Sequence, residues 1–182
     1  MRITGGSLSG RQVKVPPGII RPAMDKMRES VFAVLGDLDG SSFLDLFTGS
    51  GIIALEAASR GADDIEAVEM DLLKRKILLE NVKISPVRIS CRFMPAELYV
   101  KRAKQSFDYI FCDPPFDYKF KWELITSIHA SGLVSENTLL MLHRPANDKL
   151  KNNLPFLFLQ DTREYGRSEV DFIKFSKKIN MF

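Results

Sequence analysis

A carboxylate followed by two prolines and an aromatic ring, Asp113-Pro114-Pro115-Phe116, is the stretch of this chain best suited to chemistry. It follows the apolar run 107–112, whose length and aromatic content are typical of a buried strand. The prolines remove N–H donors, so backbone carbonyls there are left to accept hydrogen bonds from a ligand. Two acceptors beside a ring suit a planar heterocycle with an exocyclic NH₂, because its two hydrogens need two partners. Taken alone, the tetrapeptide fits a strand-ending loop with a capping Asp and a core Phe better.

A second group of residues suited to binding lies at 45–54, where a predicted strand end is followed by a glycine-containing turn and a helix start. Gly49 and Gly51 let the backbone approach a ligand closely and adopt positive φ. Phe47 and Ser50 lie in the same turn. The segment also matches the loose dinucleotide-binding fingerprint, which is weak evidence by itself.

Acids stand at the ends of three predicted strands, at Asp45, Glu69 and Asp113. The strand ends of an open α/β sheet border one crevice, so we expect the three acids at its mouth, with Glu69 accepting hydrogen bonds from ribose hydroxyls. A dinucleotide-dependent dehydrogenase would explain Glu69 and the glycines. It has no use for the Asp-Pro-Pro-Phe stretch, and a pyrophosphate would be repelled by Asp45. S-adenosylmethionine, a nucleoside carrying an amino acid and a positive sulfonium, uses every one of these features.

From residue 42 onward, runs of strand length alternate with helical patterns. We expect helices and strands at 42–47, 52–60, 65–69, 72–81, 87–93, 96–104, 109–113, 122–131 and 138–144. This alternation predicts an α/β fold with a Rossmann-like, mostly parallel sheet covered by helices on both faces. The runs 156–165 and 169–175 predict a closing hairpin whose last strand is antiparallel to its neighbours.

The N-terminal part is expected to differ from this body. Glycines around the short runs 2–4 and 12–15 predict a small β-hairpin within residues 1–20. An amphipathic helix is expected over 24–35. We therefore divide the chain into a basic hairpin, residues 1–20, and a catalytic domain, residues 21–182.

Composition places the chain of 182 residues, 45% hydrophobic and 27% charged, among ordinary globular proteins. No apolar run approaches the roughly 20 residues of a membrane span, and the N-terminus lacks a signal-peptide core. Cys91 and Cys112 lie in apolar runs and are expected to be free, buried thiols in a reducing compartment, the cytoplasm. His129 and His143 have no Cys or Glu at ligand spacing, so we predict no metal site.

The net charge of +3 is unevenly distributed. Basic residues outnumber acids in residues 72–104 and again in residues 1–28, where Asp25 is the one acid beside Arg2, Arg11, Lys14, Arg21, Lys26 and Arg28. Such clusters suit a phosphate backbone, although a solvated basic face explains them equally well without other signs of nucleic acid.

Together these motifs resemble the bacterial RsmD-type enzymes, which methylate the exocyclic N2 of a guanine in 16S ribosomal RNA. The resemblance covers essentially the whole chain and implies a class I methyltransferase fold with seven strands. It is carried by the hairpin motif 2–6 with 10–11, the helix start 21–29, and the cofactor and catalytic motifs 45–51, 68–71 and 113–116. Many amino-group methyltransferases share the motifs 45–51 and 113–116. The combination of these motifs with the Arg-Pro helix start is found in a narrower group of proteins.

The resemblance implies roles for individual residues. Glu69 would bind the ribose, Met70 would pack on adenine, and Asp45 would hold the methionine end of the cofactor. The full cofactor set is Asp45, Phe47, Gly49, Ser50, Gly51, Glu69, Met70, Pro95, Ala96 and Asp113. Two departures from the family pattern bear on it: Ala23 replaces the usual Thr, and Met94-Pro95-Ala96 replaces a segment that usually contacts adenine. Adenine recognition would then fall to the backbone around Pro95 and Ala96, or to Glu97.

For catalysis, the resemblance implies that Asp113 and the Pro114 carbonyl hold the two amine hydrogens while Phe116 stacks on an extruded base. The implied RNA contacts are Arg2, Arg11, Lys14, Arg21 and Arg28. We expect a cytoplasmic, bacterial, monomeric enzyme that acts on ribosomal RNA or the small ribosomal subunit, without a metal or a membrane.

Two alternatives stay open at this point. One is adenine-N6 methylation of DNA, which the Asp-Pro-Pro motif also fits, although little of the chain is left for a DNA-reading domain. The other is a cofactor-binding RNA assembly factor without turnover, for which the departures at Ala23 and Met94 are the support.

Overall fold

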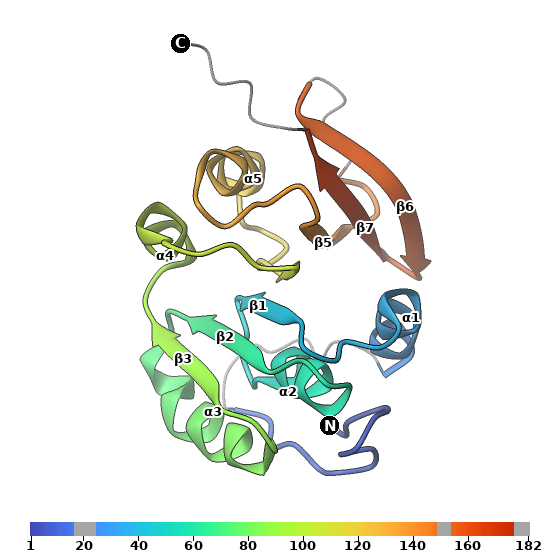
Figure 1. Cartoon of the computed structure of the whole chain (residues 1–182), viewed down its shortest axis with the longest axis vertical. Helices are drawn as coiled ribbons and strands as arrows, with labels where there is room; N and C mark the ends of the chain where they lie inside the picture. The colour runs from blue at the N-terminus through green and yellow to red at the C-terminus, as the bar shows by residue number, and fades with distance from the viewer. Residues whose placement is uncertain (17–24, 149–153, 177–182) are drawn as a thin grey trace. The chain divides into compact units, whose positions relative to one another are not determined.

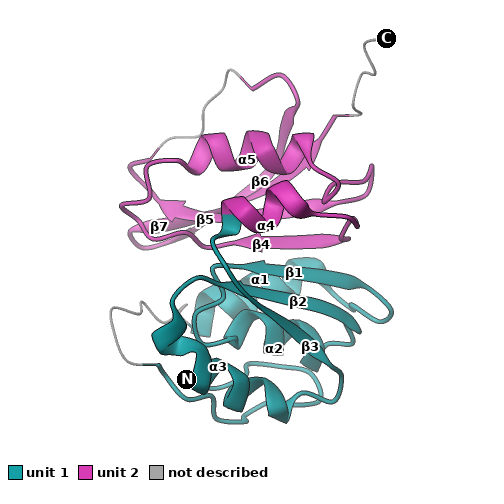
Figure 2. Ribbon diagram, turned by 90° about the vertical axis from the view of Figure 1, so that its left-hand side faces the viewer, with its two compact units in different colours: residues 1–96 teal, residues 97–182 magenta. Residues whose placement is uncertain are grey.

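The computed structural model describes residues 1–16, 25–148 and 154–176, and the chain forms two compact units, residues 1–96 and 97–182 (Figure 2). The helices are α1 (Asp25–Leu35), α2 (Ile52–Ser59), α3 (Arg75–Asn81), α4 (Ala96–Arg102) and α5 (Lys121–Ala130), with short 3₁₀ turns η1 (Leu72–Lys74) and η2 (Val82–Ile84). The strands are β1 (Ser42–Leu46), β2 (Asp64–Glu69), β3 (Ile89–Phe93), β4 (Tyr109–Cys112), β5 (Leu139–Pro145), β6 (Leu157–Tyr165) and β7 (Ser168–Phe175).

Unit 1 contains a parallel sheet in the order β3-β2-β1. Its central strands are almost entirely buried, as expected for a parallel sheet that is covered on its faces. The register pairs Leu46 with Val68 and Glu69 with Phe93, so β1 and β2 end close to one another. The predicted acids Asp45 and Glu69 therefore lie at the same edge of this sheet.

The helix that follows β1 is apolar on all sides. Every residue of α2 is buried, which agrees with its composition of Ile, Leu and Ala around a single acid, Glu56. The predicted continuous helix 72–81 is interrupted, because η1 precedes α3. Asp71 begins η1 by accepting a hydrogen bond from the Leu73 amide at 2.9 Å.

The N-terminal segment lies along α2 (Figure 1). The predicted hairpin is short and contains an antiparallel bridge between Arg2 and Gln12. The Ile3 amide donates to the Arg11 carbonyl at 3.0 Å, and the Val13 amide donates to the Met1 carbonyl at 2.7 Å. The segment also bonds to the end of α2, where Ser59 Oγ donates to the Gly5 carbonyl at 2.6 Å.

A buried ion network joins this segment to both helices of its neighbourhood. The Glu56 carboxylate accepts from Arg28 Nε at 3.0 Å and also pairs with Arg60. The same carboxylate accepts from the Thr4 amide at 2.9 Å and the Thr4 hydroxyl at 3.0 Å. Arg28 also donates to the Arg2 carbonyl at 2.7 Å, so one buried acid connects α1, α2 and the N-terminus. These donors offset the free-energy cost of burying the Glu56 charge.

Unit 2 contains strands in the order β4-β5-β7-β6. The β4–β5 pair is parallel, whereas β5–β7 and β6–β7 are antiparallel. This confirms the predicted C-terminal hairpin and its reversed last strand. Helices α4 and α5 accompany these strands (Figure 2). Arg144 crosses from β5 to β7, where it donates to the buried carboxylate of Asp171 at 3.0 Å.

The remaining sequence expectations concern thiols and membranes. Both cysteines are free, Cys112 buried and Cys91 half-buried; burial raises the pKa of the Cys91 thiol, and the charge of Asp45 raises it further. Among the described residues, no helix combines the length and the apolar character needed to cross a bilayer.

Candidate active site: two carboxylate clusters

The cofactor cluster, defined as Asp45, Glu69 and the turn 47–51, belongs to unit 1. The turn follows β1 and has three residues with positive φ: Phe47 at 64°, Gly49 at 58° and Gly51 at 82°. Positive φ is rare for a bulky residue such as Phe47 and marks a local strain that the surrounding structure must hold. It is held in part by a hydrogen bond from the Gly51 amide to the Thr48 carbonyl at 3.0 Å.

The two glycines of this turn differ in the space that surrounds them. A Cβ on Gly51 would lie 2.8 Å from Leu78 Cδ1, so Gly51 permits α3 to pack closely against the turn. A Cβ on Gly49 would meet only the Phe47 carbonyl oxygen, at 4.0 Å, among the described residues. The space beside Gly49 is therefore open, as close approach by a ligand requires. Ser50 between them is buried, and its carbonyl accepts from the Asn81 amide group at 2.8 Å.

Asp45 is 1% exposed and binds the turn and the helix that follow it. Its Oδ2 accepts a hydrogen bond from the Thr48 hydroxyl and another from the Ala54 amide at 3.2 Å. The acid thus lies beside the first turn of α2, where the helix dipole and unpaired amides favour negative charge. Asp45 consequently stabilises the shape of the turn, whatever else it binds.

Glu69 is 5% exposed and uses both carboxylate oxygens on the main chain. Oε2 accepts from the Gly49 amide at 2.9 Å, and Oε1 accepts from the Asp71 amide at 2.8 Å. Lys74 Nζ lies 3.4 Å from Oε2. A carboxylate has about four lone-pair sites, and Oε2 already has two donors, so Oε1 retains capacity for one more donor, such as a ribose hydroxyl.

The side chains predicted to surround adenine differ in their exposure. Met70 follows Glu69 and is 63% exposed, so its side chain is accessible to a ligand. Pro95 is exposed and Ala96 is buried at the start of α4. The carboxylates, the open side of Gly49 and the uncovered Met70 together fit a nucleoside carrying vicinal hydroxyls.

The amine cluster, defined as Asp113, Phe116 and His143, belongs to unit 2. Asp113 directly follows β4, and His143 lies on the neighbouring strand β5. His143 Nδ1 is 2.8 Å from Asp113 Oδ1. The Phe116 ring meets the imidazole edge-on, with centroids 5.6 Å apart and an interplanar angle of 68°. Acid, imidazole and aromatic ring therefore form one contiguous group.

The loop that carries this cluster is compact. Pro114 is buried and Pro115 is exposed, and the Tyr118 amide donates to the Pro115 carbonyl at 2.8 Å. The Asp113 side chain is 26% exposed, which leaves part of its carboxylate accessible. An accessible carboxylate oxygen beside a ring is the arrangement that an exocyclic amine on a flat base needs.

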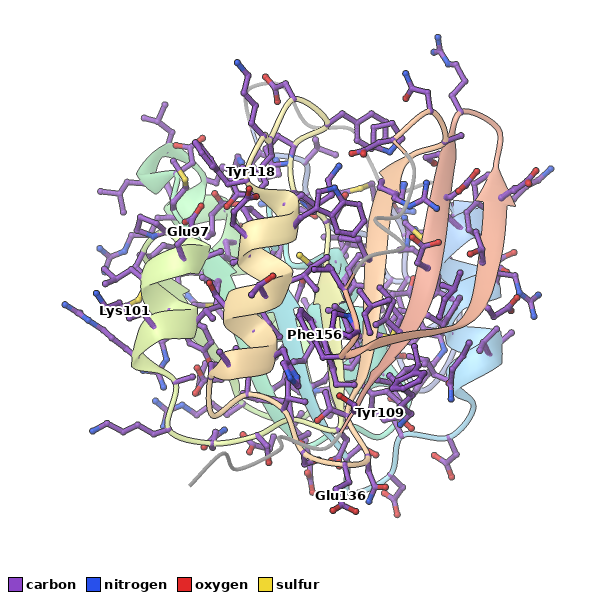
Figure 3. The ribbon with its side chains drawn as sticks, turned by 90° about the horizontal axis from the view of Figure 1, so that it is seen from above. Glu97, Lys101, Tyr109, Tyr118, Glu136 and Phe156 are labelled. Atoms are coloured by element: carbon purple, nitrogen blue, oxygen red, sulfur yellow. The ribbon has the colours of Figure 1, made fainter. Side chains whose placement is uncertain are left out.

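Tyr118, which follows Phe116 in the same loop, binds to α4 through a hydrogen bond. Its hydroxyl donates to the Glu97 carboxylate, and Figure 3 shows the two residues close together. Burial raises the pKa of Tyr118, and the hydrogen bond to Glu97 raises it further, so the phenol stays protonated and keeps donating. Glu97, one candidate for adenine recognition, thus already has a partner within unit 2.

The predicted RNA-contacting residues fall into two groups. Arg2, Arg11 and Lys14 are exposed; Arg2 pairs with Asp25 at 3.2 Å and Lys14 pairs with Glu80. Arg28 is fully buried in the network of Glu56, which removes it from any phosphate-contacting surface. Arg21 lies outside the described residues, as does Ala23.

Sequence reasoning missed His143 in its role beside Asp113. The residue stands thirty positions away in the chain, and only the pairing of β4 with β5 brings the two together. The expectation that Asp45, Glu69 and Asp113 meet at one crevice stays a prediction.

Comparison with known proteins supports the fold and the family. Residues 1–174 match the family model described as Conserved hypothetical protein 95. The chain is 31% identical over 161 residues to "Ribosomal RNA small subunit methyltransferase D" of Escherichia coli, covering 85% of this chain and 78% of that protein. It is 28% identical over 186 residues to "Putative rRNA methyltransferase YlbH" of Bacillus subtilis, covering 96% and 98%.

A solved structure shows the same fold along nearly the whole chain. "Putative methyltransferase yhhF from Escherichia coli" matches with a TM-score of 0.87 and 26% identity, covering 97% of this chain and 98% of that one. The predicted Rossmann-like class I methyltransferase fold is thereby confirmed.

Proposed function

Because the chain belongs to the RsmD-type methyltransferase family, we propose that it methylates the exocyclic N2 amine of a guanine in small-subunit ribosomal RNA, with S-adenosylmethionine as methyl donor. The enzyme class and the ribosomal RNA substrate agree with the names of its relatives. The choice of an amine as acceptor rests on one observation: Asp113 presents a partly exposed carboxylate beside the Phe116 ring in a proline-stiffened loop.

The cofactor cluster provides the groups that S-adenosylmethionine requires. Glu69 Oε1 has acceptor capacity left for a ribose hydroxyl, and the open side of Gly49 leaves room for the amino-acid part. Asp45 places a negative charge where an ammonium is favoured. When bound, the cofactor supplies an electrophilic methyl group on a positively charged sulfur.

The amine cluster prepares the nucleophile. The lone pair of an exocyclic amine is delocalised into its ring, so the amine is a poor nucleophile while it is planar. Asp113 and the Pro114 carbonyl would each accept one amine hydrogen, which favours the pyramidal geometry needed for attack. Phe116 would stack on the base once it has left its helical surroundings.

For the RNA surface we propose the exposed residues Arg2, Arg11 and Lys14, with Arg21 as a fourth. Phosphate contacts of this kind position the substrate and carry no sequence information. The buried Arg28 is assigned a structural role in place of the predicted RNA contact. We further propose that the enzyme works as a monomer in the cytoplasm and needs no metal ion.

A methyl-transfer assay tests this function directly. The protein is incubated with methyl-labelled S-adenosylmethionine and either 16S ribosomal RNA, assembled small subunits or adenine-containing duplex DNA, and the nucleosides are identified by mass spectrometry. We expect N2-methylguanosine from one of the ribosomal substrates. N6-methyladenine from DNA would replace the proposal with a DNA methyltransferase. Cofactor binding without transfer to any substrate would favour a non-catalytic assembly factor.

A further inference from the structure

His143 is held next to the predicted catalytic acid by the sheet itself. Strands β4 and β5 pair in parallel with Cys112 opposite Leu142. The residues that come next in the chain, Asp113 and His143, are therefore neighbours. The distance of 2.8 Å between Nδ1 and Oδ1 is that of a strong hydrogen bond. His143 is 9% exposed and is therefore largely fixed in place.

The direction of this hydrogen bond follows from the charge of the carboxylate. A proton on Nε2 alone would turn the Nδ1 lone pair toward the lone pairs of Asp113, which repel it. The neutral Nδ1–H tautomer and the imidazolium both donate to the acid. His143 Nε2 is buried without a hydrogen-bond partner among the described residues. In the Nε2–H tautomer this N–H would be an unsatisfied donor costing about 1–3 kcal/mol, whereas the Nδ1–H has Asp113 as its acceptor, so the Nδ1–H tautomer is favoured over the Nε2–H tautomer.

We propose that His143 is the positioning residue of the amine site, a role that rests on the proposed function. Its Nδ1–H occupies Asp113 Oδ1 and fixes the plane of the carboxylate, which leaves Oδ2 to accept a hydrogen of the substrate amine. Its imidazole edge packs against Phe116 at 5.6 Å, so the same side chain also orients the ring that stacks on the base. One buried histidine thereby sets the acceptor and the stacking surface in register with each other.

Two substitutions separate the donor from the ring. His143→Phe keeps an aromatic ring against Phe116 and removes the Nδ1–H. His143→Asn removes the ring but places an amide N–H near the former Nδ1. We expect His143→Phe to lower the single-turnover methylation rate by about tenfold to a hundredfold, because small misplacements of a catalytic group have effects of that size. His143→Asn should recover only part of the loss, because it restores a donor to Asp113 without the ring against Phe116, and both variants should bind S-adenosylmethionine as the wild type does.

The matched control is His129→Phe. His129 lies in the same unit and stacks between Phe156 at 4.4 Å and Phe175 at 5.5 Å, so an aromatic replacement keeps its packing. Its single-turnover rate should equal that of the wild type. Wild-type turnover in His143→Phe would overturn the positioning role.

A double-mutant cycle tests whether His143 acts through Asp113. In an Asp113→Asn background, His143→Phe should have little further effect on the rate, whereas independent roles would make the two losses multiply. Nitrogen NMR of the wild-type imidazole provides a test that needs neither folding of a variant nor activity. A proton on Nδ1 supports the inference, and a proton on Nε2 alone contradicts it. If the wild type methylates no nucleic acid, the proposed function fails while this NMR test still decides the geometry.

Discussion

The two carboxylate clusters are built on different principles. In the cofactor cluster, Asp45 and Glu69 are 1% and 5% exposed, and most of their donors are backbone amides, those of Gly49, Asp71 and Ala54, with the Thr48 hydroxyl and Lys74 Nζ in addition. In the amine cluster, the Asp113 side chain is 26% exposed, and the donor that holds it is another side chain, His143.

This difference determines how easily a substitution alters the geometry of each cluster. Backbone donors are present whatever the side chains are, so the cofactor cluster is maintained by the course of the chain through the turn 47–51 and the start of α2. A side-chain donor is replaced by a single substitution. The acceptor geometry of the amine cluster is therefore adjustable in evolution and in the laboratory, whereas altering the cofactor cluster disturbs the local fold together with binding.

The largest expected effect is a loss of folding stability when the buried ion pair between Arg28 and Glu56 in unit 1 is broken. Arg28→Met leaves the buried carboxylate of Glu56 without its α1 partner, and breaking a buried ion pair in this way typically costs about 3–5 kcal/mol. Chemical denaturation should show this loss, and S-adenosylmethionine binding should weaken only as far as the protein unfolds. Arg163→Met, which removes an exposed pair with Asp161, is the matched control and should leave the transition unchanged. A stable Arg28→Met protein with impaired RNA binding would return Arg28 to the RNA surface.

The next largest effect tests the cofactor cluster. Glu69→Ala removes the proposed ribose acceptor and leaves the amides of Gly49 and Asp71 without theirs. Hydrogen bonds to charged groups contribute about 1.5–3 kcal/mol, so calorimetry should show S-adenosylmethionine affinity reduced by at least about tenfold. Glu66→Ala, on the same strand and paired with the half-exposed Arg92, should bind the cofactor normally. Tight NAD binding without affinity for S-adenosylmethionine would overturn the cofactor assignment.

The smallest effect concerns the exposed cations of the N-terminus. Replacing Arg2, Arg11 and Lys14 together by Gln should lower RNA affinity and flatten its dependence on salt, by up to about 0.9 slope units per lost phosphate contact if the duplex value applies. Binding titrations at several salt concentrations measure this slope. The cofactor affinity of the triple variant serves as the control. An unchanged slope would place the RNA surface elsewhere, with the basic stretch 72–104 as the next region to test.

The sequence predicted the elements well because their signals are local. Apolar runs of strand length, glycine at the turns and acids at strand ends are all read from neighbouring residues, and the C-terminal hairpin was predicted from its turn and flanking runs. The 3₁₀ turn η1 at the start of the predicted helix 72–81 was not predicted, because the hydrogen bond from the Leu73 amide to the Asp71 side chain is not visible in the helical pattern.

Relationships between distant residues could not be predicted in the same way. Arg28 was assigned to RNA because its charge is visible in the sequence, whereas its buried partner Glu56 lies on another helix. His143 was considered only as a metal ligand, since nothing near it in the chain indicates an acid. The register of β4 and β5 is what makes it a neighbour of Asp113. The N-terminal hairpin is local and could be predicted, whereas its hydrogen bonds to α2 join residues more than fifty positions apart and could not.

The division of roles that we expect places the amine cluster at the chemical step and the cofactor cluster at cofactor binding. Its most direct test is Asp113→Ala, assayed for cofactor affinity by calorimetry and for single-turnover methylation at saturating S-adenosylmethionine. We predict cofactor affinity close to wild type and a rate lower by about 10²–10³, by analogy with the loss of one donor from an oxyanion hole. Asp113→Asn should be milder because its amide oxygen still accepts, and Asp117→Ala, in the same loop, should be normal. A folded Asp113→Ala protein that methylates at the wild-type rate would contradict the claim.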